Sequence, residues 1–481
     1  MSRSLSYRAP FFPDGLQPID RNTCDRLIHA ALEHGGDYAD LFFEYRASGA
    51  MAFDEGILRS ASRSVSMGLG IRVQQGDATG FSCTEDLSWE KMLHAARTAA
   101  RIARSGAAVA PVHVAPSTLP ARYELPTQPI DESGHAKRAL LERACKAAFE
   151  ADPRVIKAEA SFSDSLREFL VATSDGVFAF DTQPMLRFSV HAVAEQNGLR
   201  RSGSHGTGAR ADLRCFELLP PEQYGLRAAH QATRMLDARE APAGQLEVVL
   251  APGDSGILIH EAVGHGLEAD FNRKGTSNYC GCIGKSVASP LCTIVDDAGI
   301  PFSRGAINID DEGVVPGRTT LIDRGILQGY LHDRLSARLM NATPTGNGRR
   351  ETFASHPLPR MTNTYLLAGD SDPEEILRSV HHGIYAKAFG GGQVDISNGD
   401  FVFSLVESYL IEDGRLTAPL KDVNLIGNGP DVLRNIAAIG SDFRASEGTW
   451  TCGKDGQSVP VGVGCPTVKI AKITVGGTRI A

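Results

Sequence analysis

The order of hydrophobic and polar residues predicts a mixture of helices and strands in the first half of the chain. Leu27, Ile28, Ala31 and Leu32 share one face at helical spacing, which is typical of an amphipathic helix. Helices are predicted over residues 20–34, 88–104, 131–151 and 220–239. Alternating residues between glycine-containing turns predict strands over residues 39–46, 57–73, 80–84 and 155–193. The first half is therefore predicted to be a mixed α+β domain.

The second half has a different pattern, in which short apolar segments alternate with glycines. The segment Ala-Pro-Ala-Gly at 241–244 interrupts the pattern and predicts a domain boundary. A buried strand is predicted at 246–250, followed by a helix that Asp254 or Ser255 caps. From residue 290 onwards strands dominate, with one helix predicted at 373–380. We therefore expect an α+β fold with two domains: a mixed α+β domain at residues 1–240, and a β-rich C-terminal domain at 241–481.

Composition and charge exclude several classes of protein. The chain of 481 residues is 42% hydrophobic and 22% charged, as in ordinary globular proteins, so a disordered or collagen-like chain is excluded. The net charge of −8 makes direct nucleic-acid binding unlikely, because phosphate backbones attract basic surfaces. No stretch approaches the ~18 apolar residues of a membrane helix.

The cysteines and the amino end bear on the compartment. There are 9 cysteines, an odd number, and they are scattered along the chain. The first residues lack the apolar core of a secretory signal. We therefore expect reduced thiols and a cytoplasmic protein without a membrane segment.

The strongest local signal for chemistry is the segment from His260 to His265, which reads His-Glu-Ala-Val-Gly-His. Two histidines that flank a glutamate resemble the zincin motif, but with one residue too many. Five residues apart, the two imidazoles would lie roughly 140° apart on a regular helix and could not share a metal. Gly264 and Gly266 permit a bulge or an early helix end, which would make the spacing usable.

Two imidazoles leave a catalytic zinc site incomplete, because such sites normally have three protein ligands and one open position. Spacing alone leaves the third ligand open. The cysteine and carboxylate candidates are Cys280, Cys282, Cys292, Cys452, Cys465, Glu268 and Asp270. Cys280 and Cys282 would point to opposite faces of an extended segment, so they form a poor pair. Cys452 is modestly favoured because a glycine-rich loop is predicted around it.

Other polar residues suggest weaker roles. Candidates for stabilising an oxyanion are Tyr330, His332, Arg349 and Arg350. The acidic run at 310–312 lacks the ligand spacing of a calcium loop and is expected to cap a turn. Residues 360–366 predict an edge strand, with which an extended peptide substrate could pair. No residue is assigned to substrate binding.

Four segments resemble the signatures of the TldD/PmbA metallopeptidase family. They occur in the family's order and cover residues 253–277, 308–313, 361–364 and 451–454. The likeness extends over nearly the whole chain. Because the chain retains the His-Glu-His set, it resembles the catalytic TldD-type members rather than the PmbA/TldE-type sister subunits.

The resemblance implies a zinc-dependent peptidase with one Zn²⁺ per chain. Carried over position by position, it implies His260, His265 and Cys452 as metal ligands and Glu261 as the catalytic carboxylate. It also implies unfolded or small peptides as substrates, and a heterodimer with a PmbA/TldE-like subunit. Two alternatives remain: a zinc-stabilised binding or assembly subunit without turnover, and a protein that interacts with gyrase or nucleic acid.

Overall fold

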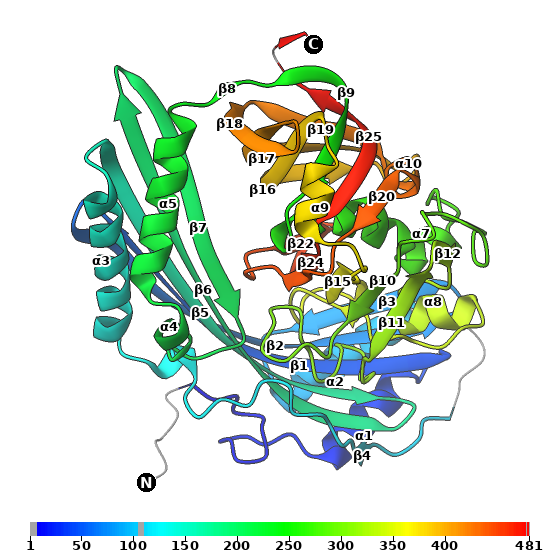
Figure 1. The fold of residues 1–481 in the computed structure, drawn as a ribbon. Coiled ribbons are helices and arrows are strands. Elements are labelled where there is room, and N and C mark those ends of the chain that lie inside the picture. The colour runs from blue at the N-terminus through cyan, green and yellow to red at the C-terminus, as the bar shows by residue number, and fades with distance from the viewer. Residues whose placement is uncertain (1–6, 104–109, 478, 481) are drawn as a thin grey trace.

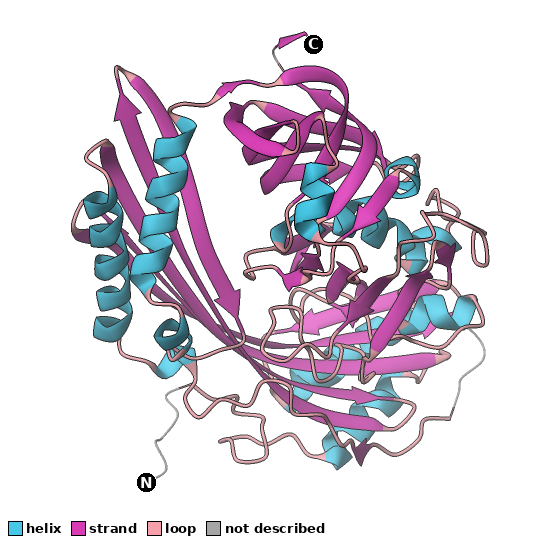
Figure 2. Ribbon diagram, viewed as in Figure 1, coloured by secondary structure: helices cyan, strands magenta, loops and turns pink. Residues whose placement is uncertain are grey.

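Helices and strands alternate along the first half of the chain, and strands dominate the second half (Figures 1 and 2). A computed structural model describes residues 7–103, 110–477 and 479–480. The predicted α+β class is confirmed. The boundary between domains near residue 240 stays a prediction.

One large antiparallel sheet organises the first half. Its strands, in spatial order, are β3 (Ala78–Thr84), β2 (Ile57–Gln75), β1 (Tyr38–Asp54), β5 (Val155–Thr173), β6 (Val177–Gln196) and β7 (Leu199–Ala209). The short β4 (Ala115–Pro116) runs parallel to β6 at Val177. Strand β1 is longer than the predicted 39–46, because it continues to Asp54 in pairing with both β2 and β5. The strand predicted at 57–73 matches β2 closely.

Helices cover one face of this sheet. They are α1 (Arg21–Ala31), α2 (Trp89–Ile102), α3 (Gly134–Ala151), α4 (Cys215–Leu218) and α5 (Pro221–Met235), with a short turn η1 (Pro129–Asp131). Helices α1 and α2 pack on Leu41 and Phe43 of β1 and on Leu170 of β5. Helices α3 and α5 pack on Ala160 and Phe162 of β5. The four longer helices match the predicted ones, although the expected end at Arg104 lies outside the described residues.

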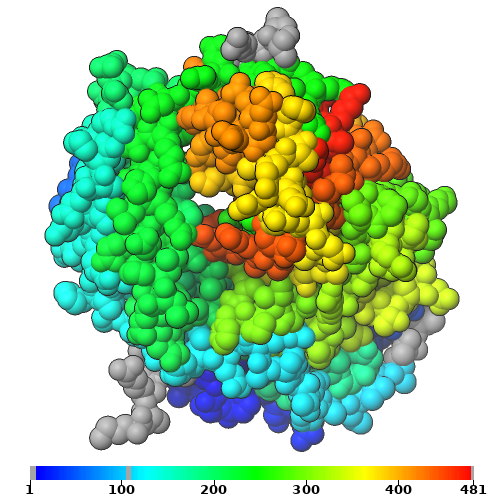
Figure 3. Space-filling view, viewed as in Figure 1, coloured from blue at the N-terminus to red at the C-terminus, as the bar shows by residue number. Residues whose placement is uncertain are grey.

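The opposite face of the sheet receives the second half of the chain. Because side chains alternate along a strand, Phe42, Phe169 and Val171 point away from the helices. They form a small apolar cluster with Ile309 and Phe353 from the second half. In Figure 1 the long strands β5, β6 and β7 curve beside the second half of the chain, which lies against the open face of the sheet. The space-filling view shows a hollow between these two parts (Figure 3).

The second half is built around a closed ring of five strands. They are β9 (Pro242–Leu250), β16 (His382–Val394), β17 (Asp400–Glu412), β19 (Val423–Asn428) and β25 (Val468–Gly476). The ring closes because β16 pairs with both β9 and β17, while β25 pairs with both β9 and β19. Short strands extend it: β8 (Arg239–Glu240), β18 (Arg415–Lys421), β20 (Ile436–Ile439) and β26 (Arg479–Ile480). Closure of this kind leaves a small barrel with an apolar interior.

A second sheet lies beside the barrel. Its order is β12 (Ile326–Leu327), β11 (Arg318–Asp323), β10 (Ile294–Asp297), β15 (Asn363–Leu366), β24 (Gly462–Cys465) and β21 (Arg444–Ala445). Two hairpins, β13–β14 (Gly348–Arg349, Leu358–Pro359) and β22–β23 (Thr451–Lys454, Gln457–Pro460), complete the strands. The expectation of a free edge at 360–366 was wrong, because β15 is flanked by β10 and β24.

The helices of the second half are short. They comprise η2 (Asp254–Gly256), α6 (Ile257–Ile259), η3 (His260–Gly264), η4 (His265–Leu267), α7 (Ala269–Arg273), α8 (Arg334–Leu339), α9 (Pro373–Arg378) and α10 (Gly429–Arg434). The first four form one continuous helical segment directly after barrel strand β9. Among the described residues, no helix combines the length and the apolar character needed to cross a bilayer.

Candidate metal centre

The helical segment after β9 changes its geometry at the two predicted histidines. Residues 257–259 are α-helical, and 260–264 form a π turn in which the N–H of His265 donates to the carbonyl of His260. A π turn contains one more residue than an α turn, so residues five apart return to the same side. The expectation that a bulge makes the spacing usable is confirmed.

Gly264 and Gly266 matter here for packing. Gly264 has ordinary helical dihedrals, but a Cβ at this position would lie 1.9 Å from the sulfur of Met361. A Cβ on Gly266 would lie 2.7 Å from the ring of Tyr279. The glycines therefore allow the helical segment to approach its neighbours closely. The predicted cap was wrong for both candidates. Asp254 accepts a hydrogen bond from the indole of Trp450 at 2.8 Å, and the Ser255 hydroxyl donates to the carbonyl of Ala386 at 3.3 Å.

Cys452 reaches the histidines from a distant hairpin. The predicted glycine-rich loop is instead strand β22, joined to β23 by a two-residue turn at Asp455 and Gly456. Both turn residues have positive φ, 49° and 71°, as tight hairpins require. Alternation along β22 buries Cys452 and Lys454 while Thr451 and Gly453 are exposed. The hairpin therefore presents the Cys452 thiol to the helical segment.

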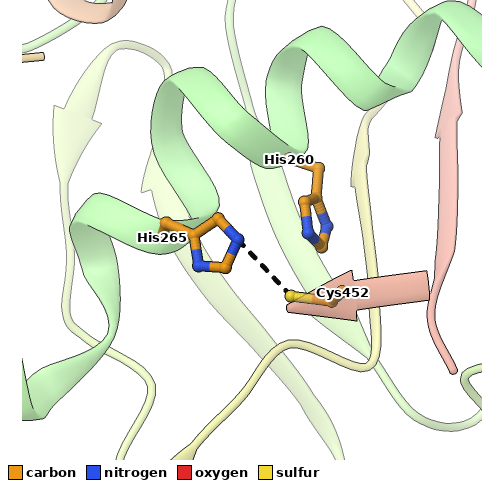
Figure 4. Close-up of side chains that lie close together, drawn as sticks. All are labelled: His260, His265 and Cys452. Carbon is orange, nitrogen blue, oxygen red and sulfur yellow. Dashed lines mark hydrogen bonds between the residues drawn. The ribbon is translucent and has the colours of Figure 1, made fainter. Parts of the chain in front are cut away.

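The structure brings His260, His265 and Cys452 together. Their candidate ligand atoms all lie within 4.8 Å of one another. The Cys452 Sγ lies 3.4 Å from Nε2 of His265, and the two imidazole centroids are 5.2 Å apart at 85°. Figure 4 shows both rings facing the thiol. Among the described residues, no other group of three His, Cys, Asp or Glu side chains has this arrangement.

The electrostatics of the cluster suit a metal ion. Burial alone would raise the pKa of Cys452, but the facing imidazoles of His265 and His260 lower it well below the usual range. All three side chains are buried, and Nδ1 of His260 has no hydrogen-bond partner. A buried polar atom without a partner is costly, and two imidazoles with a thiolate are the donors that zinc prefers. The residues therefore fit a bound metal.

Glu268 and Lys454 support the cluster in a way that the sequence did not reveal. The Glu268 carboxylate lies 3.1 Å from Nδ1 of His265, so that the other ring nitrogen faces Cys452. Lys454 lies 3.1 Å from Glu268 and 2.7 Å from Asp270. Burial would raise the pKa of Glu268, but Lys454 and His265 lower it to about 2. Carboxylates behind metal-binding imidazoles commonly fix the ring in this way.

Glu261 lies at the open side of the cluster. Its carboxylate is 3.8 Å from Nε2 of His265 and is 19% exposed, whereas the side chains of the three candidate ligands are buried. Among the described residues no lysine or arginine pairs with it, and burial raises its pKa. An unpaired carboxylate with a raised pKa is suited to accepting a proton.

The remaining cysteine and carboxylate candidates lie elsewhere. Cys465 is buried in β24 with its thiol near the carbonyls of residues 251 and 253. Cys280 contacts the carbonyl of Asn272, and Cys292 is buried beside Leu433. Cys282 hydrogen-bonds the carbonyl of residue 280. Glu268 and Asp270 pair with Lys454, as described above.

Three of the four candidate oxyanion donors already have partners within the fold, and the fourth, His332, is buried with no hydrogen-bond partner for its Nδ1 among the described residues. Tyr330 donates to the carbonyl of Tyr279 at 2.8 Å, and Arg349 donates to the carbonyls of residues 361 and 460. Arg350 pairs with Asp40 at 3.0 Å. The ring of His332 is buried, and burial lowers its pKa to about 4. The acidic run caps a turn as expected, because Asp310 accepts from three backbone N–H groups.

Family models match this chain in three consecutive parts. Residues 39–103 match domain 1, residues 128–236 the central domain and residues 243–477 the C-terminal domain of the PmbA/TldA metallopeptidases. Together the matches span most of the chain, including the candidate metal centre.

Known proteins agree with these matches. The Metalloprotease TldD homolog of Haemophilus influenzae is 44% identical over 466 residues, covering 95% of this chain and 96% of its own. The Metalloprotease MJ0996 of Methanocaldococcus jannaschii is 34% identical, covering 89% and 95%. The structure of TldE from Thermococcus kodakarensis matches with a TM-score of 0.76 at 19% identity, covering 95% and 100%. The chain therefore belongs to the PmbA/TldD metallopeptidase family.

Proposed function

We propose that this chain is a zinc-dependent metallopeptidase that hydrolyses peptide bonds, with one Zn²⁺ held by His260, His265 and Cys452. The observation that supports this most directly is the buried cluster of two imidazoles and a thiol with an unpaired glutamate beside it. Three protein donors with a fourth position open are typical of catalytic zinc sites. The relatives named as metalloproteases support the same activity.

Each residue has a distinct role in this proposal. The chemistry that zinc supplies in such a site is Lewis-acid activation of water and of the scissile carbonyl. Glu261 accepts the proton of the attacking water on its carboxylate and then delivers it to the leaving amine. Glu268, held by Lys454, keeps the His265 ring oriented towards Cys452.

Unfolded or small peptides are the proposed substrates, because the side chains of the cluster are buried and only an extended chain can reach them. We also propose a heterodimer with a PmbA/TldE-like subunit, whose contact would enclose the site. The TldE structure shares the fold of this chain. On the barrel surface, the cross-strand pair Val402 and Ile426 is exposed and apolar, as expected of an interface.

The test combines metal analysis with peptide digestion. Cys452→Ser should lose zinc, and Cys465→Ser, a matched buried cysteine, should keep it. Glu261→Gln removes the proton acceptor without removing a proposed ligand, so zinc should stay while hydrolysis of unstructured peptides falls by orders of magnitude. A chelator should abolish wild-type cleavage.

Zinc retained by Cys452→Ser would refute the ligand assignment, and full turnover by Glu261→Gln would refute the role of Glu261. Zinc binding without turnover in the presence of the partner would favour a binding subunit.

A further inference from the structure

A pocket of about 480 Å³ lies between the open face of the large sheet and the hairpin that carries Cys452. Its floor consists of small polar side chains at cross-strand positions, such as Ser48, Ser163 and Ser165. Its wall includes Thr451 and Ser458 of the β22–β23 hairpin. The pocket and the candidate metal centre therefore lie on opposite faces of the β22–β23 hairpin.

Four arginines at this pocket have no carboxylate partner among the described residues. They are Arg187, Arg210, Arg304 and Arg349. Neighbouring arginines of the same pocket are neutralised within the fold: Arg167 pairs with Glu44 and Asp311, and Arg350 pairs with Asp40. The chain as a whole has a net charge of −8, so a basic composition does not explain the unpaired group.

Three of these arginines are buried. Arg210 is 2% exposed, and its Nε has no hydrogen-bond partner. Arg349 is 5% exposed and contacts only backbone carbonyls, at residues 361 and 460. Burial, together with the charges of Arg187 and Arg210, lowers the pKa of Arg304 to about 10. The pocket lining also contains Asp164, Asp311 and Glu351, but none of them forms an ion pair with these four arginines. Buried like charges without a counterion at contact distance are costly, and an anionic ligand would offset the cost.

The backbone holds these side chains beside the metal-binding hairpin. The N–H of Arg210 donates to the carbonyl of Phe302 at 2.9 Å, which places the end of β7 next to the segment that carries Arg304. Arg304 donates to the carbonyl of Trp450 at 3.2 Å and to Oγ1 of Thr451 at 2.9 Å. Thr451 directly precedes Cys452. The arginine pocket and the Cys452 thiol therefore lie on opposite faces of the same short hairpin.

We propose that this arginine pocket binds a carboxylate of the substrate peptide and so gives the enzyme a preference for acidic or C-terminal groups near the cleaved bond. The inference rests on the proposed peptidase function, because peptides carry carboxylates as their anionic groups. Planar guanidinium groups match carboxylate oxygens in paired hydrogen bonds, which lysine cannot form. Two sources share this chemistry: the side chain of an acidic residue and the free C terminus.

The test uses unstructured peptides that differ in one charge. One pair has glutamate or glutamine at a given position, scanned along the sequence, and a second pair has a free or an amidated C terminus. Metal-loaded enzyme, co-expressed with its partner subunit, should show kcat/KM at least 10-fold higher for the charged member of one pair. A preference within the glutamate/glutamine pair would show that the pocket binds a side-chain carboxylate. A preference within the free/amidated pair would show that it binds the C terminus.

Variants connect the preference to the pocket. Arg304→Gln and the exposed Arg187→Gln should each reduce the ratio between charged and neutral peptides, whereas Arg101→Gln on the outer helix α2 should leave it unchanged. Anisotropy with labelled peptides on Glu261→Gln should show the same preference without turnover. Equal kcat/KM and equal binding within both pairs would overturn this inference and leave the peptidase intact. If no peptide binds or is cleaved, both proposals fail.

Discussion

At the scale of single residues, two glutamates beside His265 have opposite electrostatic environments. Within the described part of the chain, the imidazole of His265 is the only basic group that pairs with Glu261, and burial raises the pKa of Glu261. Glu268 is more deeply buried, yet Lys454 and His265 lower its pKa to about 2. Arg360 also lies 4.0 Å from Glu268. These cations therefore distinguish Glu268, which stays ionised and orients a ring, from Glu261, which is suited to proton transfer.

Replacing Glu268 by glutamine should weaken metal binding without removing a proposed ligand. The neutral amide can still accept a hydrogen bond from His265, but it holds the ring less strongly and no longer balances the charge of Lys454. Losses of about 10–100-fold in metal affinity are typical of such changes. Competition with a zinc chelator measures the affinity. Asp270→Asn is the matched control, because Asp270 contacts Lys454 but not His265, and its effect should be smaller. Equal affinity of Glu268→Gln and wild type would contradict the orienting role.

At the scale of elements, two local irregularities bring distant groups together. The π turn places residues 260 and 265 on one side of the helical segment, and the Asp455–Gly456 turn aims β22 at that side. The Asp-Gly turn is a favoured hairpin turn, whereas the π turn departs from regular helical geometry and costs some stability that packing must offset. The barrel and the second sheet supply this packing, since Met361 and Tyr279 lie against the glycines of the segment.

The hairpin turn can be tested through zinc content. Gly456 has φ of 71°, so Gly456→Val should strain the turn by about 1–2 kcal/mol and misplace Cys452 and Lys454. We expect weaker zinc binding and a lower thermal midpoint. Gly453→Ala is the control on the same hairpin, because its Cβ meets no atom within 4 Å and its φ is not positive. Equal losses in the two variants would show that the turn geometry is not the cause.

At the scale of the whole molecule, buried charges join the large sheet to the second half of the chain. Arg72 of β2 pairs with Asp40 at 2.5 Å and with Glu312 at 2.6 Å, and all three side chains are buried. Arg350 also contacts Asp40. Such pairs are sensitive to loss of one partner, because an uncompensated charge then remains inside.

Arg72→Met should therefore destabilise the entire chain. It leaves Asp40 and Glu312 buried with less compensation, for an expected loss of about 3–5 kcal/mol in the free energy of unfolding. Arg59→Met, which removes an exposed pair with Glu55, should cost less than about 1 kcal/mol. Urea unfolding monitored by fluorescence and by circular dichroism measures both. A loss no larger than that of Arg59→Met would mean that this network does not hold the two halves together.

Assembly is the second prediction at this scale. Co-expression with a PmbA/TldE-like chain should give a heterodimer by light scattering, and Val402→Glu should weaken it because a charge would enter an apolar contact. Val112→Glu, an exposed valine on the first half, is the control. The heterodimer should cleave an unstructured peptide and spare a folded protein. Full activity of the isolated chain, or equal cleavage of both substrates, would refute enclosure by a partner.

The sequence by itself determined what depends on near neighbours in the chain. Periodicity predicted the long helices within a few residues, because burial of one face repeats at short intervals. The glycines around His265 predicted an irregular turn for the same local reason. The alternation of the strands predicted the α+β class but not their pairing, and so it could not show that β15 is internal.

Only the tertiary structure decided which distant residues meet. Cys452 and Cys465 both lie near glycines, and spacing could not choose between them. The hairpin turns Cys452 towards His265, 187 residues away in sequence, while Cys465 faces the backbone after β9. The contact of Glu268 with His265 and the group of unpaired arginines could not be predicted from the sequence for the same reason. A side chain's partner across a fold depends on how whole elements pack, and no local pattern of residues encodes that arrangement.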